Sequence, residues 1–517
     1  MTTTKILNNH YVVPTRNPGQ LRAVFPKVKE AVVGGQTWCA VPLSLDSARI
    51  LNNLGFKTPS PIRDQYEWPG KYKPKTHQKD TAEFLTLNQR AFCLNGMGSG
   101  KTISSLWAAD YLQTTKKIRR ILIVAPLSTL DPTWADEIFA NFPLKTFAIL
   151  HGTREKRRDL LAKLHDIYII NHDGVKILQE DLMQRPDIDH FIIDEQAMYR
   201  NSRTDRWKVM NSVLNKCGFT RSAWGLTGAP TPNDPTDAFG QSKLICPENY
   251  KGHFTSFKNE TMIQITQFKW APRKGAEDTV NRILKPSIRF ALRDCVDLPP
   301  TIYSDRYVAL SKEQQKHYRD LLHQAVTEVQ GNQVTAVNAA VLIGKIIQAA
   351  LGCLYDGSGE TLKIDFSPRI NLLKELIEEC DQKVIVFVPL TGALNAVAQE
   401  LKSTWAVEVI DGSTPVQKRN RIFADFQRTK EPHIIVANAG TMSHGLTLTE
   451  ASTIVWYAPT TSNDVYNQAN ARIVRPGQKY PTNIIHLYST PEERKIYSAL
   501  KEKTKMQDLV LDLMKGG

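Results

Sequence analysis

The sequence lacks the features of secreted, zinc-binding and membrane proteins. Its seven cysteines are scattered, no C-x-x-C spacing occurs, and even the closest pair, Cys353 and Cys380, is 27 positions apart. A zinc knuckle and a disulfide framework are therefore not indicated. No apolar run approaches the ~18 residues that a membrane-spanning helix needs, and the first seven residues lack the apolar core of a signal peptide. We expect a protein of the cytosol, or of the nucleus if the host has one, with no membrane partner.

Length and charge indicate a multidomain protein with a polyanionic partner. The chain has 517 residues, which is too long for one core and suits two or three domains. Its hydrophobic fraction, 41%, is ordinary for a globular protein and argues against disorder. Lysine and arginine exceed aspartate and glutamate by 66 to 52, a net charge of +14. Such a balance favours a polyanionic partner, usually nucleic acid or an acidic membrane face, although an ordinary basic enzyme has the same composition.

Short β-branched runs alternate with helical stretches along the chain, as in parallel sheets covered by helices. The runs are residues 121–125, 168–171, 191–193 and 223–226 in the first half, and 383–388, 407–410, 433–437, 453–457 and 483–487 in the second. We therefore expect two α/β cores. Between residues 239 and 368 strand patterns fade, and helices are predicted at 310–329 and 336–351. The D-L-P-P segment, 297–300, predicts a linker. Residues 1–65, which end near Pro59 and Pro61, predict a separate small unit.

A phosphate-binding loop is predicted at residues 95–102, which read N-G-M-G-S-G-K-T. Glycines let backbone N–H groups approach phosphate oxygens, and the helix that follows offers its positive end. Lys101 would neutralise the β and γ phosphates, and the Thr102 hydroxyl would bind magnesium. Asn95 stands where the usual pattern begins with glycine. A lone G-K-T is a modest signal, so a purely structural loop is the alternative reading.

Residues 191–195, F-I-I-D-E, form an apolar strand that ends in two acids about ninety positions after the lysine. Asp194 would hold magnesium through water, and Glu195 would polarise the attacking water. Together with the glycine-rich loop, this strand predicts a site for ATP and Mg²⁺. Upstream, residues 73–78 read K-P-K-T-H-Q, and the amide of Gln78 could pair with the adenine edge.

Further segments resemble helicase superfamily two, specifically the Swi/Snf-type DNA translocases, from about residue 72 to the C-terminus. Residues 121–137 are similar to motif Ia, with Trp134 and Glu137 in place, and 225–233, G-L-T-G-A-P-T-P-N, to motif III. Other similar segments are the bridge at 284–300, motif IV at 384–387, the segment 411–414, H-G-L-T-L at 444–448 (motif V) and Q-A-N-A-R-I-V-R-P-G-Q at 468–478 (motif VI).

The resemblance implies two RecA-like parallel-sheet lobes with a small N-terminal α+β domain. The expected boundaries are 1–65 for substrate recognition, 66–296 for the first lobe, 297–490 for the second lobe with a helical insertion, and 491–517 for a C-terminal helix. It also implies that Arg472 and Arg475 are arginine fingers that reach the γ-phosphate. The remaining implied nucleotide contacts are Gly96, Gly98, Ser99, Gly100, Gly445 and Gln468.

The chain departs from the family pattern in three places. The acid motif reads D-E-Q-A, with Ala197 where the family has histidine or aspartate, a residue that links the ATP state to motif III. Motif V is two residues longer than usual. The lobe insertions are short, so nucleosome remodelling is not expected. In its compact size the chain is most similar to the family members that phages or prophages carry. Residues 11–56, around Trp38, are similar to the HARP-type recognition domain of annealing helicases, with a small structural appendage as the alternative.

These observations predict an ATP-dependent translocase of double-stranded DNA that remodels branched DNA, by annealing or branch migration, without sequence specificity. We expect contacts mainly with phosphates of duplex, forked or branched DNA, a monomer, and, for a phage protein, the cytoplasm of a bacterial host. Two alternatives stay open: a strand-separating DNA or RNA helicase, and a non-enzymatic nucleic-acid-binding scaffold.

Overall fold

A computed structural model describes residues 4–265, 270–295, 297–329, 336–355, 361–442 and 447–502. The chain divides into two compact units. The first comprises residues 1–231, 235–263 and 272–295, and the second comprises 232–234, 264–271 and 296–517. The D-L-P-P segment, predicted as a linker, directly follows this division and has neither helix nor strand.

The first unit begins with an antiparallel sheet in the strand order β1-β2-β4-β3. Its elements are β1 (Lys5–Leu7), β2 (His10–Thr15), α1 (Pro18–Val24), β3 (Lys29–Val33), β4 (Gln36–Pro42) and α2 (Leu45–Asn53). Alternation along β2 and β4 buries Tyr11, Cys39 and Val41 against α2. The guanidinium of Arg49 on α2 donates to the carbonyl oxygen of Thr86 at 2.6 Å, which joins this sheet to the lobe that follows.

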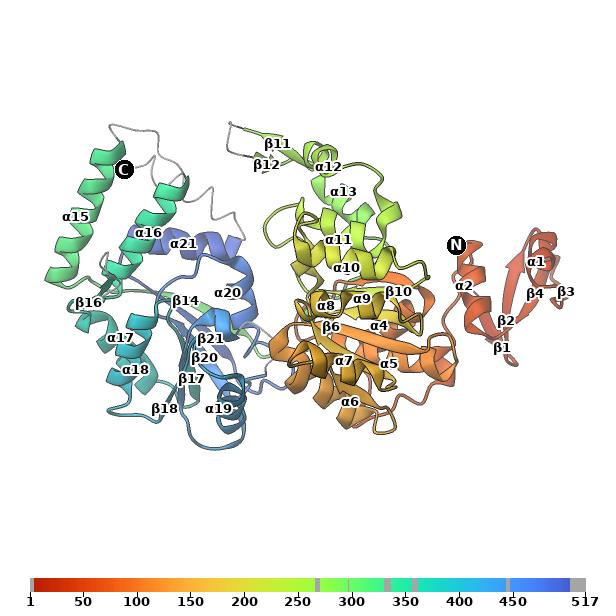
Figure 1. Ribbon diagram of the computed structural model, residues 1–517, viewed down its shortest axis with the longest axis horizontal. Coiled ribbons are helices and arrows are strands. Elements are labelled where there is room, and N and C mark those ends of the chain that lie inside the picture. The colour runs from red at the N-terminus through yellow and green to blue at the C-terminus, as the bar shows by residue number, and fades with distance from the viewer. Residues whose placement is uncertain are drawn as a thin grey trace. The chain divides into compact units, whose positions relative to one another are not determined.

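The first lobe is built on seven parallel strands in the order β13-β5-β10-β9-β6-β8-β7 (Figure 1). The strands are β5 (Arg90–Cys93), β6 (Arg120–Ala125), β7 (Phe147–Ile149), β8 (Ile167–Asn171), β9 (Ile188–Ile193), β10 (Ser222–Leu226) and β13 (Ser287–Ile288). The longer helices are α4 (Thr76–Leu87), α5 (Lys101–Thr114), α7 (Arg154–Ala162), α10 (Asp205–Asn215), α11 (Asp237–Ile245), α12 (Phe254–Thr261) and α13 (Ala276–Ile283). Shorter elements are α3 (Ile62–Gln65), α6 (Asp136–Asn141), α8 (Gly174–Ile177), α9 (Gln179–Met183), α14 (Leu292–Cys295), β11 (Met262–Gln264) and β12 (Trp270–Pro272).

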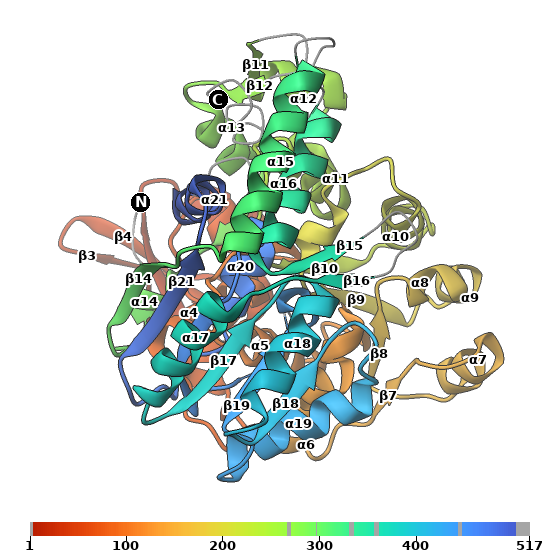
Figure 2. The ribbon, with the colours of Figure 1, turned by 90° about the vertical axis from the view of Figure 1, so that its left-hand side faces the viewer.

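The second lobe has six parallel strands in the order β14-β21-β20-β17-β19-β18. They are β14 (Thr301–Tyr307), β17 (Lys383–Phe387), β18 (Val407–Ile410), β19 (Ile434–Ala437), β20 (Ala451–Trp456) and β21 (Thr482–Tyr488). Its helices are α15 (Lys312–Val329), α16 (Ala336–Ala350), α17 (Ser367–Glu378), α18 (Thr391–Leu401), α19 (Val416–Arg428), α20 (Asn463–Asn470) and α21 (Pro491–Glu502), with a hairpin of β15 (Cys353–Tyr355) and β16 (Thr361–Lys363). Figure 2 shows α18 beside the strands β17 to β19, which it covers.

A buried ion pair fixes the end of the second lobe. Arg369 on α17 donates to both carboxylate oxygens of Glu493 on α21, at 2.9 and 2.8 Å, and both side chains are at most 1% exposed. Arg369 also donates to the carbonyl oxygen of Tyr457 and the hydroxyl of Ser489. Because loss of one partner would leave an uncompensated buried charge, removing either side chain should cost ~3–5 kcal/mol.

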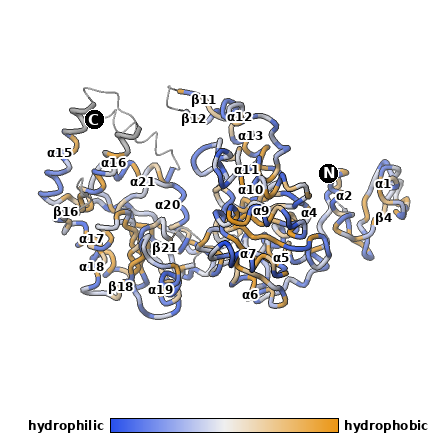
Figure 3. The backbone as a smooth tube through the Cα atoms, in the orientation of Figure 1, coloured by the Kyte–Doolittle hydropathy of each residue, from blue (hydrophilic) through white to orange (hydrophobic). Residues whose placement is uncertain are grey.

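The predicted fold class is confirmed: two parallel-sheet α/β lobes and a small N-terminal antiparallel sheet. All nine predicted strands are present, and the two predicted helices correspond to α15 and α16. In Figure 3 the hydrophobic stretches lie mainly in the interior of each lobe and the hydrophilic stretches mainly at its periphery. The expectation that strands fade between residues 239 and 368 is wrong: this range holds the short strands β11, β12, β13, β15 and β16 and the longer β14. β14 is a mixed polar edge strand that reads T-I-Y-S-D-R-Y. None of the described helices is both long enough and apolar enough to cross a bilayer.

Candidate nucleotide-binding site

The glycine-rich loop lies between the end of β5 and the start of α5. Gly98 and Gly100 have φ angles of 79° and 81°, a left-handed conformation that favours glycine. A Cβ at Gly100 would lie 2.2 Å from Nε2 of Gln78, so any larger residue there would displace the end of the Gln78 side chain. The Lys101 ammonium donates to the carbonyl oxygens of Asn95 and Gly96, at 3.0 and 3.2 Å. The loop therefore curls around the lysine at the N-terminus of α5.

Asn95, which replaces the usual first glycine, fixes the loop to two distant segments. Its side chain is 1% exposed. The amide nitrogen donates to the Thr81 hydroxyl on α4 at 2.8 Å, and the amide oxygen accepts from the backbone N–H of Phe290 at 2.9 Å. A ring nitrogen of His77 lies 2.9 Å from the carbonyl oxygen of Ser99. This departure from the family pattern thus has a structural reason: the asparagine positions the loop from both sides.

The acid pair, Asp194 and Glu195, follows β9. In the sheet, β10 lies between β9 and β5. Asp194 accepts hydrogen bonds from the indole N–H of Trp134 at 3.1 Å and from the backbone N–H of Glu195 at 3.0 Å. Desolvation, together with the neighbouring charge of Glu195, raises the pKa of Asp194 to about 6. Glu195 has a φ of 47°, an uncommon left-handed conformation for a residue with a side chain. Strain of this kind is typical of functional sites.

The loop and the acid pair suit a magnesium nucleotide. Parallel β5 and β9 bring both to the carboxyl-terminal edge of one sheet, where such folds bind ligands. The Ser99 hydroxyl is buried and has no hydrogen-bond partner among the described residues, so a phosphate oxygen would satisfy it. Within the described ranges no group of three His, Cys, Asp or Glu side chains could hold a metal. One carboxylate (Asp194), one hydroxyl (Thr102), phosphate oxygens and water are what Mg²⁺ commonly binds.

Trp134, which lies in the segment similar to motif Ia, contacts the acid pair directly. It lies in a π-helical turn, Leu130–Ala135, after β6, and its side chain is fully buried. Such turns are rare and frequent at functional sites. Its indole N–H orients the carboxylate of Asp194. Tryptophan has a single donor and no acceptor, so it can only favour the ionised, acceptor form of that group.

Gln78 lies over the loop, but part of its hydrogen-bonding capacity is already used. Its amide oxygen accepts from the backbone N–H of Lys75 at 2.9 Å, which caps α4. The amide nitrogen faces Gly100. A contact between Gln78 and adenine stays a prediction, and this geometry leaves the nitrogen as the group that would make it.

The second unit holds the other predicted site residues. The Arg472 guanidinium donates through Nε to the carbonyl oxygen of Gln468 at 2.9 Å, and only 6% of Arg472 is exposed. Burial lowers the pKa of Arg475 to about 10, so this group keeps its positive charge at neutral pH. The roles of Gln468, Arg472 and Arg475 stay predictions. Gly445 lies outside the described residues.

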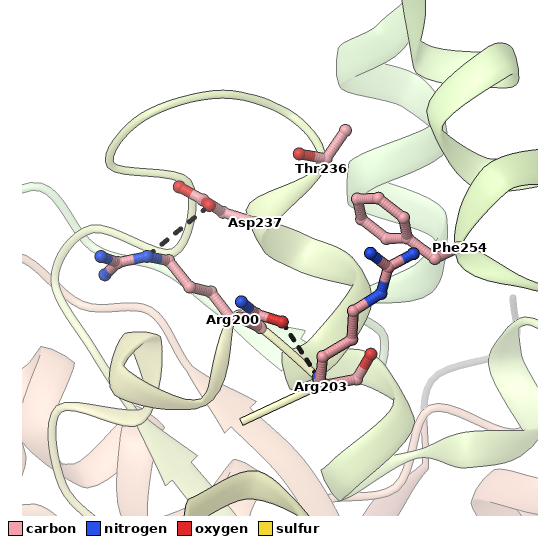
Figure 4. Close-up of a pocket in the computed structure, with 7 residues that line it drawn as sticks. Arg200, Arg203, Thr236, Asp237 and Phe254 are labelled. Carbon is pink, nitrogen blue, oxygen red and sulfur yellow. Dashed lines mark hydrogen bonds and ion pairs between the residues drawn. The ribbon is translucent and has the colours of Figure 1, made fainter. Parts of the chain in front are cut away.

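Residues 194–200, which follow β9 and begin with the acid pair, are called the acid turn. A pocket beside this turn was not expected from the sequence. Its volume is about 260 Å³. Figure 4 shows the Arg200 side chain directed toward Asp237, with Nε 3.8 Å from a carboxylate oxygen, and Arg203 beside the Phe254 ring. The residues that line the pocket are Arg200, Asn201, Ser202, Arg203, Thr236, Asp237 and Phe254. The pocket therefore borders both the acid turn and the first turn of α11.

Comparison with known proteins gives two matching family models. The SNF2-related domain matches residues 77–352, more than half of the chain, and the helicase conserved C-terminal domain matches residues 368–477. Both matches confirm the predicted enzyme class, that of a helicase-like ATPase. The described part of the chain outside these two segments includes the N-terminal sheet, whose likeness to HARP-type domains stays a prediction.

Individual relatives are distant. An uncharacterized ATP-dependent helicase of Mycoplasma genitalium is 25% identical over 77% of this chain, and the putative ATP-dependent helicase/translocase YwqA of Bacillus subtilis is 25% identical over 83%. The chain spans only 38% and 47% of those two proteins. Putative protein p41 of Acyrthosiphon pisum secondary endosymbiont phage 1 is 23% identical over 86% of this chain and 99% of its own length. The solved SWI2/SNF2 ATPase core of Sulfolobus solfataricus with double-stranded DNA is 20% identical, with a TM-score of 0.39, over 87% of this chain and 94% of that one.

Proposed function

Because the chain belongs to the SNF2-related family, we propose that it is an ATP-driven translocase of double-stranded DNA. The observation that carries the proposal is the pairing of a phosphate-binding loop with a partly buried acid pair at one sheet edge. Lys101 and the loop N–H groups would bind the phosphates, and Asp194 with Thr102 would hold magnesium. Glu195 would orient and polarise the attacking water. Arg472 and Arg475 of the second unit would stabilise charge on the γ-phosphate.

The net charge of the protein and the names of its relatives support DNA as the polymer along which it would move. The net charge of +14 favours a polyanion. Relatives include proteins named as a helicase/translocase and as a chromatin-remodeling complex ATPase. We propose contacts with phosphates and not with bases, so that binding is independent of sequence. A translocase of this type would remodel forks or junctions by branch migration or annealing.

The N-terminal sheet is the proposed sensor of branched DNA. Trp38 on β4 is only partly buried and lies outside the hydrophobic core of the sheet, with the Lys5 ammonium 5.7 Å from its ring centre. An accessible aromatic ring beside a cation suits unpaired bases and phosphates. The same sheet is tied to the first lobe through Arg49, so a structural role is the competing explanation.

The deciding experiment measures ATP turnover by the full chain with no nucleic acid, single-stranded DNA, duplex, fork and RNA. Glu195→Gln, which keeps the shape of the side chain, is the control for contaminating ATPases. We expect duplex and fork to stimulate most. In parallel, displacement of a triplex strand reports translocation, and separation of a forked duplex reports unwinding. Unwinding without triplex displacement would favour a strand-separating helicase, and absence of turnover would favour a binding scaffold.

A further inference from the structure

The acid motif of this chain carries a glutamine, Gln196, directly after the acid pair, and its side chain is fully buried. Its amide nitrogen donates to the amide oxygen of Gln241 on α11 at 2.7 Å. Gln241 is also fully buried, and its amide nitrogen donates to the carbonyl oxygens of Pro230 at 2.5 Å and Asp237 at 2.8 Å. A continuous chain of hydrogen bonds therefore joins the acid turn to the segment that follows β10.

The carbonyl oxygens of Pro230 and Asp237 determine which way the donors and acceptors run along this series of hydrogen bonds. Gln241 faces two carbonyl oxygens, so it must present its nitrogen to them and its oxygen to Gln196. Gln196 must then present its nitrogen, which directs its oxygen toward Gly225 of β10. A Cβ at Gly225 would lie 1.6 Å from that oxygen, so the glycine is required for the arrangement.

Backbone packing supports the same connection. A Cβ at Gly240 would lie 2.3 Å from the carbonyl oxygen of Arg200 and 2.4 Å from that of Tyr199, so α11 lies directly on the acid turn. The indole N–H of Trp207 donates to the carbonyl oxygen of Gly240 at 2.7 Å and holds the helix there. At the start of α11, Thr236 and Asp237 line the pocket that also contains Arg200 and Arg203 (Figure 4).

We propose that Gln196 and Gln241 are positioning residues that couple the state of the acid pair to the segment after β10 and to α11. This proposal rests on the proposed function, since the coupled event is stimulation of ATP turnover by DNA. At the position where the family has histidine or aspartate, Ala197 has only a methyl group, which cannot form a hydrogen bond to the segment after β10. The amide of the preceding residue, Gln196, makes the connection through α11 instead.

Two features of Gln196 suit it to pass a change at the acid pair on to α11. Gln196 is the residue next to Glu195, so a rotation at the acid pair displaces its side chain. The Gln196 amide oxygen is buried without a hydrogen-bond partner among the described residues, and an unmet buried acceptor of this kind is unfavourable. Such a group favours a second arrangement in which it gains a donor, which makes the acid turn responsive to a change at the site.

The test compares wild-type protein with Gln241→Met, which keeps the volume of the side chain and removes every hydrogen bond. Matched to it is Gln314→Met in the second unit, because Gln314 is also a buried glutamine that donates to two backbone carbonyls. The readouts are ATP affinity, basal turnover, the ratio of DNA-stimulated to basal turnover, and Tm. We expect Gln241→Met to lower the stimulation ratio by ~10-fold, within the range of couplings between sites, with ATP affinity and basal turnover retained. Gln314→Met should keep the ratio.

A second set of variants keeps the proposal falsifiable if Gln241→Met does not fold. Gln196→Met keeps the volume beside Gly225 and removes only the bond to Gln241, so it should lose the same stimulation. Gly225→Ala should also lose it, but adding Gly225→Ala to Gln196→Ala should cost nothing further, because the smaller side chain makes room. Wild-type protein that DNA does not stimulate would overturn the proposed function and this proposal with it. Stimulated wild type with equally stimulated variants, or parallel losses in all readouts, would overturn the coupling role alone.

Discussion

The charge on Asp194 should make the protein less stable than it could be, and Asp194→Asn tests this. The pKa of this partly buried carboxyl rises from 3.8 to about 6, chiefly through desolvation. At ~1.4 kcal/mol for each pKa unit, the ionised form costs the native state about 3 kcal/mol at neutral pH. Asparagine removes that cost. It also loses one of the two accepted hydrogen bonds, from Trp134 or from the N–H of Glu195, which costs ~1–2 kcal/mol.

The net expectation is a gain of roughly 1–2 kcal/mol, or a rise in Tm of ~2–4 °C per kcal/mol for a domain of this size. The sign depends on pH. The native state holds the Asp194 proton more tightly than the unfolded state, so wild-type stability falls as pH rises from about 4 to about 6. The asparagine variant does not share this loss. Its advantage should therefore be complete near pH 8, shrink below about pH 6, and reverse near pH 4, where only the lost hydrogen bond remains.

The assay is thermal unfolding at several pH values without nucleotide or magnesium, since a bound cation would lower the pKa of Asp194 again. Asp159→Asn, on the exposed face of α7, is the control for a change from carboxylate to amide. ATP turnover by Asp194→Asn should be lost in the same preparation. A variant that is less stable near pH 8, or a difference in Tm that does not change with pH, would refute the reasoning.

Four further predictions concern the site and the DNA. Lys101→Ala should weaken ATP binding because it deletes a phosphate contact, whereas Glu195→Gln should bind ATP and not turn it over; near-normal hydrolysis by either variant would contradict the site. Arg472→Ala or Arg475→Ala should lower kcat by ~10³ with little change in ATP affinity, and a parallel loss of Tm would instead indicate that these buried groups hold the second lobe together. The logarithm of DNA affinity should fall linearly with the logarithm of salt, with a slope near −0.9 for each phosphate contacted, and a flat response would exclude backbone binding. Trp38→Ala should lower stimulation by forks relative to duplex at an unchanged Tm, while Leu51→Ala, in the core of the same sheet, should lower Tm through a cost of ~2–5 kcal/mol; an unchanged ratio of fork to duplex stimulation for Trp38→Ala removes the recognition role.

The sequence by itself determined the parts of the site that are local. A glycine-rich loop before a helix and two acids after an apolar strand can be identified because their chemistry depends on neighbours in the chain. The central strands were equally readable, since strands buried on both faces form continuous apolar runs. The strand β14 could not be identified in this way, because it is a largely exposed edge strand that mixes polar and apolar residues.

Tertiary structure decided every contact between distant residues. Asn95 departs from the sequence pattern, and only the fold shows that Phe290, 195 positions away, accounts for it. Trp134 reaches Asp194 across 60 positions, and Gln196 reaches Gln241 across 45. The order of strands in the sheet puts β10 between the loop strand and the acid strand, and no local propensity determines that order. Local sequence specifies backbone conformation and burial, whereas the partner of a buried polar group depends on how the sheets and helices are assembled.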